Sequence, residues 1–277
     1  MDIERAVGEV AEEILGPGAV SGRLEADSLA LVELALALEE RLGIRLPEDA
    51  SWATFDEVMA AARAADGSTP DRLGSGFGRL QWAAHGVLRA PIRLAYRLVV
   101  SGPDRVPPFG PAILASNHDS LLDIPCLVVA SPRPVWFMAK VELFRGPLAS
   151  ALLRRFGGFP VRRAASDLRA VRTALDVLRR GRALGMYPEG TRAAYLRPFL
   201  PGAAWLALAT GAPLVPVGVS GTAEALPRGS SLPRRTHVTV RFGEPIELGR
   251  EGDARARLER ARAVTEDLRS SVELLAR

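Results

Sequence analysis

The sequence predicts an α/β domain, with a mixed central sheet flanked by helices, preceded by a small all-α four-helix domain. Three observations predict this fold class. From residue 97 onward, short apolar runs alternate with helical segments, the pattern of a buried sheet covered by helices. The first 66 residues carry apolar side chains only at helical spacing. Those 66 residues also hold 15 acidic residues and five arginines, a net charge of −10, whereas the whole chain carries +4.

The remainder of the chain therefore carries +14, and such an asymmetry favours two parts that attract one another. The chain has 277 residues, 48% hydrophobic and 25% charged, an ordinary globular composition. We predict a first domain over residues 1–66, a linker over residues 67–76 and a second domain over residues 77–277. The stretch from Asp66 to Gly76 is rich in Gly, Ser and Pro, and its eleven residues reach at most roughly 36 Å.

The apolar pattern locates three of the four expected helices in the acidic segment. Apolar residues recur at helical spacing from Ile3 to Leu15, and Gly16-Pro17-Gly18 ends that run. A second helix begins at Asp27-Ser28 and ends before Gly43, and a turn at Pro47 follows. Thr54 is the expected cap of the last helix.

The run from Glu25 to Pro47 resembles the acyl carrier protein family, and the resemblance extends over residues 1–66. It implies that Ser28 carries a covalent phosphopantetheine, attached by a phosphopantetheinyl transferase. It also implies that the second helix is the surface presented to enzymes, through the side chains of Asp27, Leu29, Glu33, Glu39 and Glu40. In the alternative interpretation, Asp27-Ser28 is only a helix cap and the segment is an unmodified docking module for lipid or polyketide enzymes.

A basic amphipathic helix is expected over residues 77–94, where His85, Arg89 and Arg93 fall on one stripe among apolar residues. Such a helix suits an anionic membrane surface. The alternative is a surface helix that packs on its own domain.

Strands and helices then alternate. The expected strands are Leu98–Val100, Ala112–Ala115, Val135–Met138, Leu184–Tyr187, Leu214–Val219 and Val238–Phe242, and the expected helices include Ala165–Arg180, Ala203–Thr210 and Ala254–Leu275. The stretch between Arg197 and Glu224 has no charge, but prolines and glycines interrupt it too often for a membrane-spanning helix of about 20 residues.

The segment Asn117-His-Asp-Ser-Leu-Leu-Asp123 places His118 five positions before Asp123. A histidine held by a carboxylate is a base that takes a proton from a hydroxyl near pH 7. The same segment has the pattern of a capping box, with Ser120 as the cap and Asp123 bonding back to it. Positions i and i+5 diverge around a helix, so the pair requires His118 to precede the helix.

Three further motifs follow, at Phe137–Phe144, Gly157–Arg163 and Tyr187–Arg192, and Val215-Pro-Val217 comes after them. In this order and spacing the four motifs resemble the glycerolipid acyltransferase family that includes the bacterial lysophosphatidic acid acyltransferases, over residues 95–245. The resemblance implies a catalytic pair of His118 and Asp123. The acceptor-binding residues that it implies are Lys140, Arg163, Glu189, Gly190, Thr191 and Arg192.

Two departures from the family pattern leave the acceptor headgroup open. Arg162 precedes Arg163 where many relatives have an acidic or amide residue, and Leu200 stands where many have lysine. Outside the family context, the Glu189-Gly190 pair is simply a turn after a strand. Lys140 is the chain's only lysine, and Glu142 is the alternative partner for its charge.

Together these residues predict an enzyme, an acyltransferase that moves a fatty acyl group from a thioester to the hydroxyl of a lysophospholipid such as 1-acylglycerol-3-phosphate, giving phosphatidic acid. The expected acyl donor is a carrier protein, which can be the chain's own first domain. The alternative donor is acyl-CoA, and the alternative acceptor is a specialised alcohol or amine. No metal and no nucleic-acid partner is expected. Met1 to Arg5 lack a secretory signal, and Cys126 is the only cysteine. A cytoplasmic location, peripheral at the inner face of the cell membrane, is therefore expected.

Overall fold

The computed structural model describes residues 3–20, 23–24, 26–48, 51–65, 79–162, 167–193, 195–230 and 232–277, without the side chains of residues 79–85. The predicted linker, residues 67–76, and the predicted acceptor-binding Arg163 lie outside the described residues, as does the side chain of His85. The domain boundaries predicted around that linker therefore stay predictions.

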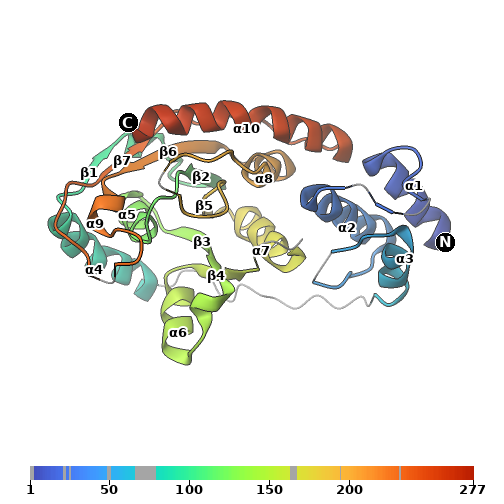
Figure 1. The fold of residues 1–277 in the computed structure, drawn as a ribbon, viewed down its shortest axis with the longest axis horizontal. Helices are drawn as coiled ribbons and strands as arrows, with labels where there is room; N and C mark the ends of the chain where they lie inside the picture. Colours follow the sequence, from blue (N-terminus) through green and yellow to red (C-terminus); the bar gives the residue numbers. More distant parts are fainter. Residues whose placement is uncertain are drawn as a thin grey trace.

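A seven-stranded sheet forms the centre of the second domain (Figure 1). Its strands are β1 (Val99–Ser101), β2 (Ala112–Ser116), β3 (Val135–Lys140), β4 (Gly158–Val161), β5 (Ala183–Met186), β6 (Leu214–Ser220) and β7 (Thr239–Phe242). Their order in the sheet is β1-β7-β6-β2-β5-β3-β4. All neighbouring pairs are parallel except β6 and β7. The sheet is therefore mixed, as predicted.

Strand β4 was not predicted, whereas each of the six expected strands is present within two residues of its expected ends. Strand β4 has the sequence Gly-Phe-Pro-Val, in which glycine and proline argue against a strand. The strand lies at the edge of the sheet, where proline is tolerated because one side of the strand needs no hydrogen-bonded partner.

Helices cover both faces of the sheet (Figure 1). Successive side chains of β2 point to opposite faces. Ile113 and Ala115 belong to the apolar cluster that contains α7 (Leu168–Arg179), α8 (Gly202–Thr210) and α10 (Ala254–Ala276). Leu114 belongs to the cluster on the other face, which α5 (Asp123–Ala130) and α4 (Arg79–Ala95) cover.

The smaller elements are the 3-10 turns η1 (Pro103–Arg105) and η2 (Val141–Phe144) and the helices α6 (Pro147–Arg155) and α9 (Thr222–Ala225). Helix α6 has no buried residue, and its Leu148 and Leu152 are exposed. None of the helices in the described part of the chain is both long and apolar enough to cross a membrane.

The acidic segment folds into three described helices, α1 (Ile3–Leu15), α2 (Ser28–Leu42) and α3 (Phe55–Arg63). Asp27 caps α2 by accepting the backbone N–H groups of Leu29 and Ala30, and Thr54 caps α3 as expected. The expected four-helix domain is thus wrong for the described residues. Residues 43–48 and 51–54 contain no helix, because Gly43 ends α2 in the left-handed conformation (φ 66°) and Pro47 follows.

This helical module packs against α7, α8 and the first half of α10 through α2 (Figure 1). Glu33 pairs with Arg257 of α10 at 2.9 Å and accepts the indole N–H of Trp205 in α8. Glu39 pairs with Arg172 of α7, and Asp27 with Arg262 of α10 at 2.7 Å. The attraction expected from the charge asymmetry is therefore present as specific ion pairs between the module and the α/β domain.

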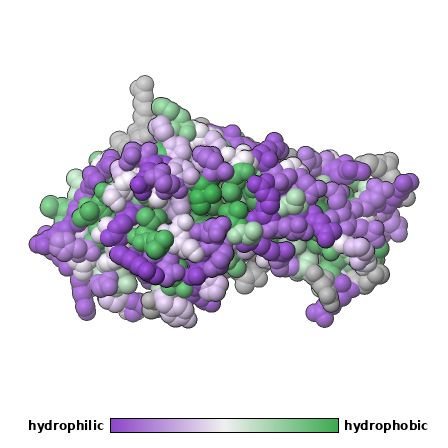
Figure 2. Space-filling view, turned by 90° about the horizontal axis from the view of Figure 1, so that it is seen from above, coloured by the Kyte–Doolittle hydropathy of each residue, from purple (hydrophilic) through white to green (hydrophobic). Residues whose placement is uncertain are grey.

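Helix α10 runs along the top of the molecule in the view of Figure 1. Its buried residues face the core, whereas Arg255 and Glu259 form an exposed i,i+4 pair at 3.3 Å. Seen from above, the surface is mainly hydrophilic, and the largest group of hydrophobic side chains lies near the middle (Figure 2).

Candidate active site

The loop that joins β2 to α5 carries the first motif, at the carboxyl end of the central strand of the sheet. The side chain of Asn117 fastens this loop to β6. Its amide donates to the carbonyl of Val219 and its oxygen accepts the N–H of the same residue, both at 2.8 Å. Ligands bind outside the carboxyl ends of strands in such sheets, so the next residue, His118, lies where chemistry is expected.

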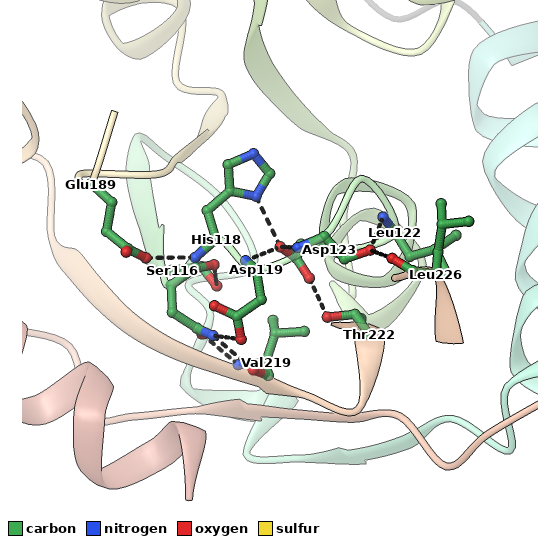
Figure 3. Close-up of polar contacts among 11 residues, drawn as sticks. Ser116, His118, Asp119, Leu122, Asp123, Glu189, Val219, Thr222 and Leu226 are labelled. Carbon is green, nitrogen blue, oxygen red and sulfur yellow. Dashed lines mark hydrogen bonds and ion pairs between the residues drawn. The ribbon is translucent and has the colours of Figure 1, made fainter. Parts of the chain in front are cut away.

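His118 and Asp123 form the predicted pair (Figure 3). Nδ1 of the imidazole lies 2.8 Å from Oδ2 of Asp123, and both side chains are buried. An ionised carboxylate only accepts hydrogen bonds, so Nδ1 carries the proton and Nε2 presents a lone pair. Among the described residues Nε2 has no hydrogen-bond partner, and it points away from Asp123 in Figure 3. The arrangement is that of a general base.

The carboxylate of Asp123 is held on both of its oxygens. Oδ2 accepts the backbone N–H groups of Asp119 and Ser120 at 2.8 Å each, and Oδ1 accepts the hydroxyl of Thr222. These donors fix the direction of the carboxylate. Asp123 therefore holds the imidazole in one tautomer and orientation.

The capping-box alternative made two predictions, of which the bond from Asp123 to Ser120 is confirmed and the cap at Ser120 is wrong. Asp123 bonds back to the N–H of Ser120, as that motif predicts. Ser120 is not the cap, because α5 begins at Asp123 and its N-cap position is Leu122. The hydroxyl of Ser120 instead donates to the carbonyl of Leu226 at 3.0 Å. His118 precedes the helix, which is the condition that the pair required.

Glu189 lies in the turn after β5 and contacts the backbone of the first motif. One of its oxygens accepts the N–H of His118 at 2.7 Å, and the other accepts the N–H of Arg197 at 3.0 Å. The side chain is buried, and burial raises its pKa although both N–H groups act in the opposite direction. Gly190, at φ 67°, forms the left-handed turn that follows. Both carboxylate oxygens thus bond backbone N–H groups, and each has a further lone pair, so the predicted contact with an acceptor hydroxyl stays a prediction.

Tyr187 stacks on the catalytic imidazole. The two ring centroids lie 4.2 Å apart with an interplanar angle of 26°. The ring covers one face of His118, and burial raises the pKa of the phenol well above its usual value. Within the described residues its hydroxyl has no hydrogen-bond partner. No role of Tyr187 beside His118 was predicted from the sequence.

Asp119 adds a further carboxylate beside the pair. It accepts a hydrogen bond from Asn117 at 3.2 Å and lies below the loop in Figure 3, away from the imidazole. Burial raises its pKa to about 6, and the neighbouring carboxylates of Asp123, Glu189 and Glu224 add to that effect. The side chain therefore sits in the loop as a partly protonated group near neutral pH.

The predicted acceptor-binding cations occupy different positions. Lys140 ends β3 and pairs with Glu142 at 3.3 Å on the surface, as the alternative to a binding role predicted. Arg192 is half-buried in the turn after β5 and forms no ion pair with the described residues. Thr191 adjoins it, half-exposed. Arg192 is consequently the cation in this turn whose charge is available to an anionic group.

Thr222 and Asn117 were missed as residues of the site. Thr222 bonds Asp123 once and Asn117 bonds Val219 twice, in each case across about a hundred residues of sequence. Their only sequence signal is their position directly after a predicted buried strand, β6 for Thr222 and β2 for Asn117. Polar residues at such strand ends gather at one edge of the sheet.

Ser28 is the first residue of α2, and its side chain is exposed. It forms no hydrogen bond with the described residues, since Asp27 performs the capping. An exposed hydroxyl at a helix N-terminus is accessible to a modifying enzyme, and the helix dipole there favours an attached phosphate. The residue thus fits the predicted attachment site and does not act as the cap.

Comparisons with known proteins find acyltransferases. Residues 97–220 match the family model described as "Acyltransferase". The chain is 29% identical over 164 residues to a 1-acyl-sn-glycerol-3-phosphate acyltransferase of Bacillus subtilis, an alignment over 59% of this chain and 80% of that protein. It is 34% identical over 123 residues to a lyso-ornithine lipid O-acyltransferase of Pseudomonas aeruginosa, over 43% and 47% of the two chains.

Among solved structures, the 1-acyl-sn-glycerophosphate acyltransferase PlsC from Thermotoga maritima superposes with a TM-score of 0.53 at 22% identity, over 88% of this chain and 96% of that chain. This likeness supports the fold. The chain spans about half the length of several relatives, such as 44% of the chloroplast protein LPAT1 of Arabidopsis thaliana and 45% of the human beta enzyme. The family match begins at residue 97, so the carrier resemblance of residues 1–66 stays a prediction.

Proposed function

We propose that the α/β domain, which matches the acyltransferase family model over residues 97–220, moves a fatty acyl group from a thioester to the hydroxyl of a lysophospholipid, with 1-acylglycerol-3-phosphate as acceptor and phosphatidic acid as product. The prediction that the protein is an enzyme, an acyltransferase, is confirmed by the family match and the relatives. The observation that carries the proposed chemistry is the buried His118–Asp123 pair with Nε2 directed away from the carboxylate.

The reaction follows from that geometry. Nε2 of His118 takes the proton of the acceptor hydroxyl as its oxygen attacks the thioester carbonyl. The imidazolium that forms is stabilised by Asp123, whose four donors keep its charge in place. When the tetrahedral intermediate collapses, the carbon–sulfur bond breaks and His118 returns the proton to the leaving thiolate. The products are the ester and the free thiol, and His118 is again neutral.

The acceptor headgroup is assigned from charge. Arg192 has no ion-pair partner among the described residues and adjoins the turn that bonds to His118. A guanidinium binds a phosphate through two parallel hydrogen bonds. The matched lyso-ornithine lipid enzyme favours a second candidate acceptor, with a different headgroup. Rates with lysophosphatidic acid and with a lyso-ornithine lipid distinguish the two, and Arg192→Ala is expected to raise KM only for the phosphate-bearing acceptor.

The test of the reaction uses a labelled acyl thioester and lysophosphatidic acid. His118→Ala is expected to abolish product formation, and Asp123→Asn to lower kcat by about three to four orders of magnitude. The matched control is His237→Ala. His237 is exposed, and its Nε2 lies 3.2 Å from Nη1 of Arg97, with no contact to His118 or Asp123 among the described residues. Turnover that survives in His118→Ala with an intact fold would refute the assignment.

We infer further that residues 1–66 serve as a carrier, with phosphopantetheine attached to Ser28 by a phosphopantetheinyl transferase. The exposed position of Ser28 at the start of α2 supports this. When bound, the group supplies a thiol for the acyl thioester. Intact mass after co-expression with a phosphopantetheinyl transferase tests it. An increase that disappears in Ser28→Ala supports the carrier; an unchanged mass supports the unmodified docking module, with acyl-CoA as the donor.

A peripheral position at the inner face of the cell membrane accompanies this function. Exposed apolar side chains on α4 and α6, including Val87, Leu94, Leu148 and Leu152, lie on elements that also carry arginines. Apolar and basic side chains together suit an anionic lipid surface. Co-sedimentation with vesicles containing an anionic lipid, but not with neutral vesicles, is the expected result.

A further inference from the structure

The face of α2 that joins the module to the α/β domain is buried. The side chain of Glu33 is 3% exposed, and it lies between Arg257 and the indole of Trp205. Arg172 is equally buried, and it bonds both oxygens of Glu39 and the carbonyl of Leu46. Separating the two parts would also expose apolar side chains of α2, α7, α8 and α10, which form one continuous buried cluster. The docked arrangement is therefore a stable part of the fold.

The start of α2 lies beside the first half of α10. A cavity of about 240 Å³ between them is lined by Asp27 and Ala30 of α2 and by Arg255, Leu258 and Arg262 of α10. The Asp27–Arg262 ion pair closes its rim. Ser28, which follows Asp27, is thus placed at the level of residues 255–262 of α10.

The catalytic pair lies at the level of the other end of α10. Gly218 in β6 meets the backbone of Leu275, where a side chain would collide with it. The next residue, Val219, bonds the side chain of Asn117, and His118 follows. From Leu258 to Leu275 a helix rises about 25 Å, at about 1.5 Å for each of 17 residues. Figure 1 shows α2 at one end of the molecule and α5 and α9, which contact the catalytic residues, at the other.

A phosphopantetheine chain is about as long as six extended residues, or roughly 20 Å at about 3.3–3.6 Å each. From Ser28, the rise along α10 alone is about 20–25 Å, counted from Arg262 or from Leu258 to Leu275, so the arm has no length left for the sideways distance to His118. We propose that the docked module cannot serve its own active site, and that an acyl group on Ser28 is transferred to an acceptor bound at His118 of a second copy of this chain. This inference rests on the proposed carrier function of Ser28.

Two readouts test it, and the first needs no loaded carrier. Spin labels are placed at Ser28→Cys and Leu121→Cys, since Leu121 is exposed beside the catalytic loop and the native Cys126 is buried. Pulsed electron paramagnetic resonance on the magnetically diluted full chain measures the distance between the labels within one chain. A single distribution at about 25 Å or beyond is expected from the helix rise. A distribution centred below about 20 Å would overturn the proposal.

The second readout uses two variants. His118→Ala, acylated on Ser28, supplies the donor, and Ser28→Ala supplies the active site, with lysophosphatidic acid as acceptor. Product is expected only when the two are mixed. In the acylated wild-type chain the single-turnover rate constant should fall tenfold upon tenfold dilution. A rate constant independent of concentration, with no product from the mixture, would overturn transfer between copies. Failure of the proposed carrier function gives a different result from failure of transfer between copies. The acylated wild type and the mixture would then both form no product, while the distance between the spin labels would still report the docked position of the module.

Discussion

The carboxylate of Glu189 accepts the backbone N–H of His118 at 2.7 Å, so a residue of the fourth motif holds the backbone of the first. Ala193, four residues later, donates its N–H to the carbonyl of His118 at 3.0 Å. The turn after β5 thus bonds both the backbone N–H and the backbone carbonyl of His118. The position of the imidazole depends on this turn as well as on Asp123.

Glu189→Gln should lower kcat by about two orders of magnitude, equivalent to about 3 kcal/mol of transition-state stabilisation. The amide replaces one acceptor with a donor, which then faces the N–H of His118 or of Arg197. Steady-state rates with varied acceptor separate kcat from KM. The exposed Glu247 provides the control as Glu247→Gln. If Glu189 instead bound the acceptor, as the family resemblance implied, KM would rise while kcat stayed near the wild-type value.

Thr222→Val should lower kcat about tenfold, since it removes the hydroxyl that donates to Oδ1 of Asp123. Unfolding in urea should also show a loss of about 1–2 kcal/mol, because a buried charged acceptor loses a partner. Thr265→Val is the matched control, because that hydroxyl bonds only the carbonyl of Ala261 in its own helix. Equal effects of the two substitutions on kcat would contradict the role given to Thr222.

Tyr187→Phe is expected to keep kcat within about twofold and to raise the free energy of unfolding by about 1 kcal/mol. The ring that stacks on His118 remains, and a buried hydroxyl without a described partner is removed. Rates and urea denaturation of the same preparation provide the check. A large fall in kcat would mean that the hydroxyl contacts the reacting groups.

Asp119→Asn should stabilise the protein in a pH-dependent manner. The pKa of Asp119 in the folded chain, about 6, lies above its ordinary value of 3.8, so folding takes up a proton between these values. The ionised group therefore costs stability above pH 6, and that cost disappears as the pH falls towards 4. With allowance for its partial exposure, the variant should gain about 1 kcal/mol at pH 8 and little at pH 4.

Urea denaturation at the two pH values measures this gain. Asp104→Asn, at an exposed position in η1, is the control. A gain of the same size at both pH values would show that the charge of Asp119 is not its cause.

Arg257→Met should destabilise the chain by about 3–5 kcal/mol, because Glu33 then stays buried without its ion-pair partner. Adding Glu33→Leu should restore most of that loss, since the buried charge is then also removed. A double-mutant cycle in urea measures the coupling between the two residues. Additive effects of the two substitutions would indicate that the module does not rest on this pair.

The contact between His118 and Asp123 and the mixed sheet were predictable because both depend on local patterns. His118 and Asp123 are five residues apart, and the predicted strands are apolar runs that a buried sheet requires. Thr222 and Tyr187 were not predictable as partners of that pair, because their contacts join strands whose order the sequence does not reveal. Strand β4 was missed since its proline and glycine are acceptable only at the sheet edge.

The sequence by itself determined a histidine spaced to meet Asp123 and an acidic helical module with a serine at the start of its second helix, since residue type and local spacing decide these. Only the tertiary structure decided where they lie. The module meets α10 near Arg262, whereas His118 lies level with Leu275 at the other end of that helix. A net charge predicts that two parts attract, but only the packed positions of Glu33, Glu39 and their arginines determine which faces meet.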